Sequence, residues 1–353
     1  MTPARGHDPL EILRRFAPGT PLRNAAELIL RQRTGALILL GSGERFDEVC
    51  SGGFRLKDAK FSAQRIAELA KMDAGIVVDE DATEILRANV HFIPRSSLAT
   101  SETGTRFRTA ERLAQQTGAP VLAVSEEGRA VAVVFTGETR YELRSPAALH
   151  AEGNQSLQSL ERLRRRLQDA EDRLTRLEVD DVVTIRDVVL LLQRAALLTR
   201  LSADVDRIVI ELGGAGHLIS VQADDLMEGV GDLAQLVYGD YVRRRSGRLI
   251  FDLLDHVRTG DLHDTQAVSD AIGLGAIDGP ARARGIRALA RVPRLPESVK
   301  DALVAHFKTF PNLLKATVGD LAEVEGVGRT RGQQLRSYLD RLQQHGTPFA
   351  IAD

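Results

Sequence analysis

The segment GTRFRTAER, residues 104–112, combines residue types that could hold a phosphate group. Gly104, Thr105 and Arg106 stand at the start of a predicted helix, where backbone N–H groups, a hydroxyl and a guanidinium can converge on one anion. The alternative is the first turn of an ordinary amphipathic helix. Phe107 shares a helix face with apolar residues of the following two turns, so it can point into a core.

Asp73 is a second candidate, because it stands between a helical pattern and the apolar run GIVVD, residues 75–79. A carboxylate at such a junction can bind a metal ion or serve as a base for a sugar hydroxyl. It can equally be an ordinary turn residue. Further polar junctions follow in RANVHFIP, residues 87–94, and in VLAVSEEG, residues 121–128. Together these junctions favour a nucleotide site in an α/β domain.

The elements that must position these side chains alternate along residues 1–150. Apolar residues at helical spacing predict helices over 21–33 and 61–72. Short apolar runs next to Gly or acidic residues predict buried strands over 36–41, 75–79, 121–125 and 130–135. The alternation predicts an α/β domain with a mixed sheet.

Residues 151–280 are predicted to be a helical spine. Leucines and an alanine recur in steps of three and four from Leu160 to Leu177, which indicates a long helix with a coiled-coil-like stripe. Arginines 162 and 164–166 lie on its other faces, where we expect a solvated surface. A second helix is expected over 184–201, and GLGAIDGP, residues 273–280, is a plausible linker.

Residues 281–353 are predicted to be short helices that carry 12 Lys and Arg against 7 Asp and Glu, a net charge of +5. Their motif LAEVEGVGRTRGQQLRSYL, residues 321–339, resembles a helix-hairpin-helix. Two glycines allow a tight turn that opens a helix, where a DNA phosphate can bind. The residues assigned to DNA on this reading are Gly326, Val327, Gly328, Arg329 and Arg331. The alternative is a plain helical hairpin.

A partner hairpin is expected over 289–317, upstream of the Gly-Val-Gly turn. Its turn position reads Arg294-Leu295-Pro296 and lacks the glycines. We therefore expect this first turn to pack rather than to hold phosphate.

Composition excludes several classes of protein. The net charge of -2 gives no overall nucleic-acid signal, and the 353 residues include 11 Phe, 4 Tyr and 0 Trp, too few for a base-stacking surface. Cys50 is the one cysteine of the sequence, so neither an intramolecular disulfide nor a cysteine metal cluster is possible. We find no signal-peptide pattern and no apolar run that could span a bilayer, and we expect a cytoplasmic protein without a membrane partner.

The order of these motifs resembles the DNA-integrity scanning diadenylate cyclase family (DisA). RTGALILLG, GGFRL, ELAKMDAG, RANVHFIP, ETGTRFRTAERLAQQTG and the Gly-Val-Gly hairpin all fall where the family pattern would place them. The resemblance implies a multidomain α/β plus all-α protein. It has a cyclase domain at 1–150, a spine at 151–280 and a tandem helix-hairpin-helix domain at 281–353.

The resemblance also implies an activity. Members join two ATP molecules into cyclic di-AMP with release of two pyrophosphates, using Mg²⁺ or Mn²⁺. Two cyclase domains face each other across a two-fold interface, the assembly is a homo-octamer, and branched DNA inhibits the cyclase. For this chain the resemblance implies DNA-damage scanning at the nucleoid.

Residue roles carry over only where the motifs match. The family's Asp-Gly-Ala corresponds to Asp73-Ala74-Gly75, with the two small residues exchanged, and its Gly-Thr-Arg-His-Arg corresponds to residues 104–108, with Phe107 in place of the histidine. The resemblance assigns catalysis to Asp73, Arg106 and Arg108, and metal binding to Asp73. Ser125-Glu126-Glu127 departs from most chains of the family and looks like the Ser-Glu-Glu of membrane-anchored relatives of the cyclase domain, which makes Glu126 a further candidate metal ligand. The resemblance assigns ATP contacts to Ala74, Gly75, Phe92, Gly104, Thr105, Arg106, Phe107, Arg108, Thr109 and Ser125.

Two functions remain open at this point. The retained aspartate, threonine and arginines favour an active cyclase that is controlled by DNA. Phe107 can neither coordinate a cation nor move a proton. Together with the exchanged Ala74-Gly75 pair, it favours an impaired paralogue that binds DNA junctions or senses nucleotide. Glu126 in SEEG could compensate as a metal ligand, or could simply belong to an acidic turn.

Overall fold

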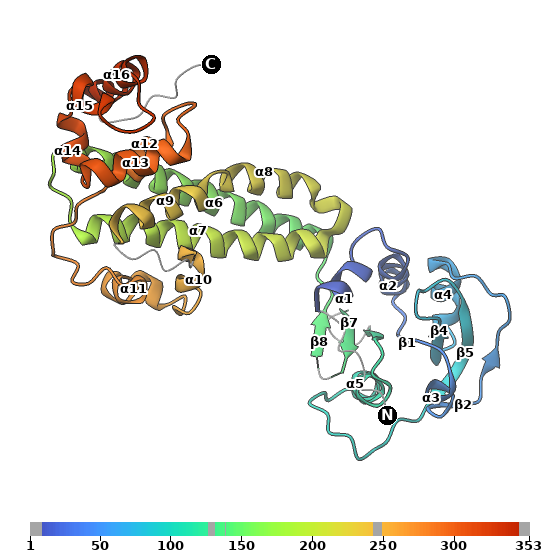
Figure 1. The fold of residues 1–353 in the computed structure, drawn as a ribbon. Helices are drawn as coiled ribbons and strands as arrows, with labels where there is room; N and C mark the ends of the chain where they lie inside the picture. Colours follow the sequence, from blue (N-terminus) through green and yellow to red (C-terminus); the bar gives the residue numbers. More distant parts are fainter. Residues whose placement is uncertain (1–8, 126–130, 138, 243–248, 346–353) are drawn as a thin grey trace. The chain divides into compact units, whose positions relative to one another are not determined.

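A computed structural model describes residues 9–125, 131–137, 139–242 and 249–345 (Figure 1). Contacts divide the chain into two compact units. The first comprises Met1–Asn154 with Asp206–Ser220, and the second comprises Gln155–Val205 with Val221–Asp353. Across the described ranges, none of the helices combines the length and the apolar character that a membrane span requires.

Among the described residues the first unit contains a sheet of eight strands, and its mixed character confirms the prediction. Its strands are β1 (Ala36–Leu40), β2 (Cys50–Ser51), β3 (Phe54–Arg55), β4 (Gly75–Val78), β5 (Ile85–Phe92), β6 (Val121–Ser125), β7 (Val131–Thr136) and β8 (Thr139–Glu142). They follow the order β2-β5-β4-β1-β6-β7-β8, and β3 also pairs with β5. β1 and β4 are parallel, whereas the other pairs are antiparallel. The four predicted strands are confirmed as β1, β4, β6 and β7, whereas β2, β3, β5 and β8 were not predicted.

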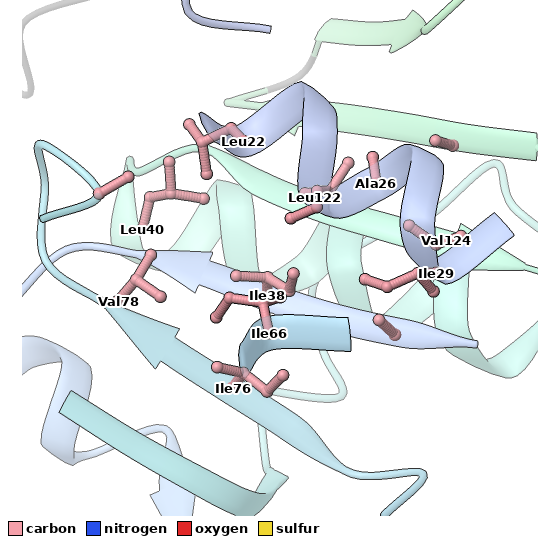
Figure 2. Close-up of a cluster of buried hydrophobic side chains, with 14 of the residues drawn as sticks. Leu22, Ala26, Ile29, Ile38, Leu40, Ile66, Ile76, Val78, Leu122 and Val124 are labelled. Carbon is pink, nitrogen blue, oxygen red and sulfur yellow. The ribbon is translucent and has the colours of Figure 1, made fainter. Parts of the chain in front are cut away.

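Helices cover both faces of this sheet. They are α1 (Pro9–Arg15), α2 (Pro21–Gln32), α3 (Glu44–Asp47), α4 (Ala63–Ala70) and α5 (Thr105–Thr117). Figure 2 shows Leu22, Ala26 and Ile29 of α2 in one buried cluster with Ile38 of β1 and Ile66 of α4. α5 packs on the opposite face. The helices predicted over 21–33 and 61–72 are therefore confirmed as α2 and α4.

Strand β1 shows why the sheet is buried on both sides. Ile38 and Leu40 belong to the cluster under α2 and α4, whereas Leu37 and Leu39 belong to the cluster under α5. Side chains alternate between the two faces of a strand, so an uninterrupted apolar run is what a doubly covered strand requires. Burial of each such side chain contributes about 1.5–3 kcal/mol. The edge of this sheet is thereby held rigidly enough to carry a site.

Helices make up the second unit and run on into the first. They begin with α6 (Pro146–Val179), α7 (Ile185–Leu212), η1 (Gly213–Gly216), α8 (His217–Met227), α9 (Val230–Tyr241), α10 (Ile250–Leu254), η2 (Asp261–His263) and α11 (Thr265–Ile272). The predicted stripe on α6 is buried at Leu160, Leu167 and Leu174. Arginines 162, 165 and 166 are exposed, as expected of a solvated face, whereas Arg164 is half-buried.

The segment predicted as a linker, residues 273–280, is hydrogen-bonded to the start of α7. Ile185 N–H donates to the carbonyl of Gly279 at 3.0 Å, and Arg186 N–H donates to that of Ile277 at 2.9 Å. Arg186 also pairs with Asp278 at 2.8 Å. The segment lies within the second unit.

The last helices are α12 (Ile286–Ala290), α13 (Glu297–Phe307), α14 (Phe310–Lys315), α15 (Val318–Ala322) and α16 (Arg329–His345). α16 has 17 residues, so the expectation of uniformly short helices was wrong there. The Gly-Val-Gly turn joins α15 to α16 and buries Val327 in the core of this region. Leu295, in the upstream turn between α12 and α13, is buried in the same core, which agrees with a packing role.

A cluster of buried charges connects α12 to α6 and α9. The Arg287 guanidinium contacts Glu178 at 2.5 Å, Glu171 at 3.4 Å and the hydroxyl of Thr175 at 3.0 Å. All three charged side chains are at most 5% exposed. Asp240 of α9 accepts the backbone N–H groups of residues 286 and 287 at 2.6 and 2.8 Å, and so caps α12.

Burial and neighbouring charges together set the pKa values of this cluster. Burial raises the pKa of the Asp240 carboxyl to about 6, and the charge of Glu178 adds to the rise. The N–H groups of α12 and the charge of Arg287 oppose it. Burial alone would lower the pKa of Arg287, but Glu178 and Glu171 raise it above the ordinary value. The arginine therefore stays charged inside the protein.

Candidate functional site

The predicted site residues gather around a cavity of about 500 Å³ at one edge of the first unit's sheet. At this edge β1 and β4 begin, at Ala36 and Gly75, and β5 and β6 end, at Phe92 and Ser125. The start of α5 forms the remaining side. The cavity therefore lies at the amino ends of the parallel pair of strands. Antiparallel β5 and β6 reach the same edge with their carboxyl ends.

Asp73 lies where the chain passes from α4 to β4. Its N–H donates to the carbonyl of Ala70 at 3.1 Å, which ends the helix, and its φ of 51° places it in the left-handed region. Asp and Asn tolerate this conformation better than most residues. Ala74, in contrast, does not have a positive φ, so the exchanged order of the small residues costs no backbone strain there.

The carboxylate of Asp73 is 81% exposed and pairs with Arg106, Nη2 to Oδ1, at 2.9 Å. Arg106 can reach it because the guanidinium lies over the backbone of Gly35: a Cβ atom on Gly35 would overlap the guanidinium carbon. Gly35 thus leaves the space in which this ion pair forms. An arginine that holds a carboxylate at the mouth of a cavity can exchange that partner for a phosphate.

The first turn of α5 supplies the phosphate-binding groups that the sequence predicted. Gly104 precedes the helix, with φ -76° and ψ 140°, and has no side chain that could cap the first N–H groups. Thr105, Arg106 and Thr109 line the cavity together with Gly104, whereas Arg108 is exposed and does not line it. Backbone N–H groups and the helix dipole at this end favour an anion.

Aromatic rings form the apolar side of the cavity. Phe107 is half-buried, packs against the core under α5 and lies 6.2 Å from the ring of Phe135, centroid to centroid. The expected core contact of Phe107 is therefore confirmed, and the same residue also lines the cavity. Phe92 lines it from the end of β5, beside Ala74 and Gly75.

A divalent cation could be held here by Asp73 together with phosphate oxygens. Mg²⁺ is usually bound by one or two carboxylates and by phosphates of the substrate, so a single exposed carboxylate fits this role. Within the part of the chain that the structure describes, no group of three or more His, Cys, Asp and Glu side chains could hold a metal alone. Glu126, the other predicted ligand, lies outside the described residues.

Sequence reasoning missed some residues of the site. His91, Thr103 and Val90 also line the cavity, and Gly35 supports Arg106 from below. His91 and Val90 follow from β5, a strand that was not predicted. The sequence signal for Gly35 was weak. It stands directly before a buried strand, where residues with side chains are also tolerated, so nothing local showed that glycine is needed.

The predicted DNA-binding turn has a defined geometry. Gly326 has a φ of +83°, and a Cβ atom there would lie 2.8 Å from Val299, so this turn requires glycine on both counts. Gly326, Gly328 and Arg329 are exposed, whereas Val327 is buried. The half-buried Arg331 donates to the carbonyl of Gly326, so it also holds the turn together.

Comparisons with known proteins cover both units. Residues 23–139 match the family described as "DisA bacterial checkpoint controller nucleotide-binding", and residues 143–278 match "DisA bacterial checkpoint controller linker region". The DNA integrity scanning protein DisA of Acidothermus cellulolyticus is 44% identical over 336 residues, 93% of this chain and 91% of that protein. DisA of Kineococcus radiotolerans is 44% identical over 346 residues, 95% of this chain and 96% of that protein.

Among solved structures, DacA from Staphylococcus aureus is 21% identical with a TM-score of 0.30, and the match covers 38% of this chain and 88% of that chain. The sequence relatives therefore extend over far more of the chain than this structure does.

Proposed function

This chain belongs to the DisA family, and from that premise we propose that it is a diadenylate cyclase. It condenses two ATP molecules into cyclic di-AMP, releases two pyrophosphates, and is regulated by branched or damaged DNA. The observation that carries the proposal is the cavity that unites Asp73, Arg106 and the start of α5.

Arg106 and Asp73 divide the work at this cavity. When triphosphate enters, the guanidinium of Arg106 turns from Asp73 to the phosphate oxygens, and the N–H groups at the start of α5 bind the same anion. Asp73 is then free to orient the 3′-hydroxyl of the nucleotide and accept its proton. That hydroxyl oxygen attacks the α-phosphorus of the ATP on a second copy of the chain, and pyrophosphate leaves.

Two further features of the proposal concern the metal and the assembly. Asp73, with Glu126, would hold Mg²⁺ or Mn²⁺, which offsets the negative charge of the phosphates when bound. The product has two-fold symmetry, so two cyclase domains must face each other. This arrangement suits an oligomer of closed symmetry, and the family pattern makes that oligomer an octamer. We place the protein in the cytoplasm, in association with the nucleoid.

A direct assay tests the activity. Full-length protein that is folded and oligomeric is incubated with ATP and either Mg²⁺ or Mn²⁺, and cyclic di-AMP is sought by mass spectrometry. We expect product together with pyrophosphate in a ratio of one to two. Absence of product with both metals would contradict the cyclase proposal.

The second candidate is an impaired paralogue that binds DNA junctions or senses nucleotide. It is favoured by Phe107, which packs into the core where the family pattern has a histidine. Under this alternative the cavity still binds ATP, because Arg106 and the start of α5 are retained.

Replacement of Phe107 by histidine separates the two candidates. If the parent is an active cyclase, we expect Phe107→His to be no faster, because the aromatic contact with Phe135 is weakened and a polar ring enters the core under α5. Initial rates of cyclic di-AMP formation measure the effect. Activity that appears in the variant and is absent from the parent would instead favour the impaired paralogue.

DNA binding is proposed for the turn between α15 and α16. Arg329→Glu should weaken binding of a four-way DNA junction at least about tenfold and reduce its salt dependence, because one phosphate contact is replaced by a repulsion. Arg331→Glu should act similarly but also loosen the turn, since Arg331 donates to Gly326. Titrations at several salt concentrations measure both effects.

Lys315→Glu makes the same change of charge at an exposed position at the end of α14 and serves as the control. If it weakens junction binding as much as Arg329→Glu, overall charge rather than this turn determines the affinity.

A further inference from the structure

The start of β4 and the end of β5 meet in an unusually close contact beneath the cavity. A Cβ atom on Gly75 would overlap the ring of Phe92: it would lie 2.8 Å from Cζ and 2.5 Å from Cδ2, with Cε2 closer still. Carbon atoms that are not bonded to each other normally stay about 3.5–4.0 Å apart. The ring therefore occupies the space that a side chain at position 75 would need.

Nothing in the backbone demands glycine at this position. Gly75 does not lie in the left-handed region, in contrast to Asp73 two residues earlier. It is a paired strand residue, opposite Leu37 on β1 and Val90 on β5. An alanine would thus be compatible with the strand itself, so the contact with Phe92 is what excludes it.

The ring cannot move away from Gly75 without cost. Phe92 packs against the buried cluster under α5, which includes Leu37, and Phe107 packs against the same cluster. Its free side faces the cavity. A methyl group on residue 75 would therefore push the ring either into a close-packed core or into the cavity.

We propose that Gly75 is a positioning residue. The absence of a side chain seats the Phe92 ring over the start of β4, where it forms the apolar wall that receives the nucleobase. Gly75 and Phe92 are complementary in size and act as one pair. The order Ala74-Gly75 therefore accommodates the large ring and does not indicate an impaired site. The identity of the ligand rests on the proposed function, whereas the complementarity of the pair does not.

A double-mutant cycle on the full chain tests the pair without any ligand. Gly75→Ala should lower the unfolding temperature by about 3 °C or more, because the methyl group overpacks the wall. In a Phe92→Leu background the same change should lower the unfolding temperature by less than about half as much, since leucine leaves room for the methyl group. Equal costs in both backgrounds, or no cost in either, would overturn the pairing.

The same four proteins are then titrated with α,β-methylene-ATP, which cannot release pyrophosphate. We expect Gly75→Ala to weaken binding at least about tenfold in the parent and less than about twofold in the Phe92→Leu background. Inorganic tripolyphosphate, which lacks the base, should bind all four proteins equally. An equal loss for tripolyphosphate would overturn the assignment of the ring to the base.

Two matched glycine variants define the specificity of the effect. Gly104→Ala borders the same cavity, but its Cβ atom would lie 3.9 Å from its nearest neighbour, Phe107, and any loss from the altered N-cap of α5 should be the same in the parent and in the Phe92→Leu background. Gly35→Ala displaces Arg106 instead, and Phe92→Leu should not relieve it. If Phe92→Leu relieves Gly35→Ala as well, the effect is not specific to the pair.

Failure of this inference differs from failure of the proposed function. If the parent binds no nucleotide analogue but the unfolding temperatures are coupled, the complementary pair stands and its role toward a nucleobase is refuted. If nucleotide binds and the unfolding temperatures are additive, the proposed function stands and Gly75 has no positioning role.

Discussion

Replacement of Asp73 by asparagine should reduce formation of cyclic di-AMP at least about a hundredfold. Asparagine has nearly the same shape and tolerates the left-handed conformation that Asp73 adopts, with φ 51°. It lacks the negative charge needed to accept the proton of the 3′-hydroxyl or to hold a cation. The variant should therefore fold and bind ATP, but not react.

The chain offers a matched control in Asp58, an exposed aspartate with φ 53° that does not line the cavity. Asp58→Asn makes the same chemical change in the same backbone conformation, and it should leave the rate unchanged. Initial rates and the dissociation constant for the ATP analogue are measured for both variants. A rate for Asp73→Asn within threefold of the parent would remove Asp73 from the proposed mechanism.

Replacement of Arg287 by methionine should lower the free energy of unfolding of the second unit by about 3–5 kcal/mol. The arginine is 4% exposed and contacts Glu171 and Glu178. Methionine fills a similar volume but leaves Glu178 buried without its counter-charge, while Glu171 keeps Arg291 as its remaining partner. Denaturant unfolding of the full chain, followed by circular dichroism, measures the loss in the transition of the helical region.

Arg282→Met is the control, since Arg282 is 71% exposed and pairs with Asp181 only at 3.9 Å. A surface change of this kind should alter the unfolding free energy by no more than about 0.5 kcal/mol. If the two variants unfold alike, the buried cluster is not what holds α12 against α6 and α9.

The loss at Arg287→Met should also depend on pH. The charge of Arg287 lowers the pKa of Asp240, which burial has raised to about 6, so its removal raises that pKa further. Above the ordinary carboxyl pKa near 3.8, Asp240 in the unfolded chain has lost its proton, whereas Asp240 in the folded variant keeps its proton up to the raised pKa. Because the folded state binds more protons, its stability falls as pH rises. We therefore expect a larger loss at pH 8 than at pH 5.

The fold of the first unit was largely predictable because buried strands and amphipathic helices leave plain hydrophobic patterns. β1, β4, β6 and β7 are uninterrupted apolar runs, and they were found at nearly their observed bounds. β5 was missed although its residues 86–92, LRANVHF, alternate between apolar and polar, because only uninterrupted apolar runs were taken to predict strands. Asn89 has a positive φ, and the pairing with β4 shifts its register, so the strand is irregular there although its sequence pattern is regular.

The components of the site could be predicted, but their contacts could not. Glycine, threonine and arginine at a helix start indicate an anion site in any chain, and the structure places them around one cavity with Asp73. The overlap of Gly75 with Phe92, and of Gly35 with Arg106, depends on the distance between elements that are far apart in the sequence. No local pattern encodes such a distance.

The buried charges of the second unit escaped prediction for a different reason. Glu171, Thr175 and Glu178 recur along one face of α6, yet acidic residues on a helix usually face solvent. Their burial depends on partners that are distant in the sequence: Arg287, more than 100 positions away, together with Arg291 and the hydroxyl of Tyr241. The leucine stripe on the same helix was predicted because it needs no partner of opposite charge to be buried.

The backbone at Asp73 limits how this cavity can vary among relatives and in the laboratory. A left-handed residue between α4 and β4 is tolerated as Gly, Asn or Asp, while other side chains pay a steric penalty of about 1 kcal/mol or more. A saturation library screened for solubility alone should therefore retain all three of these residues. The same library screened for turnover should retain aspartate, and glutamate should be depleted from both despite its carboxylate. At this position the backbone conformation first limits which residues are well tolerated, and the reaction then selects aspartate among them.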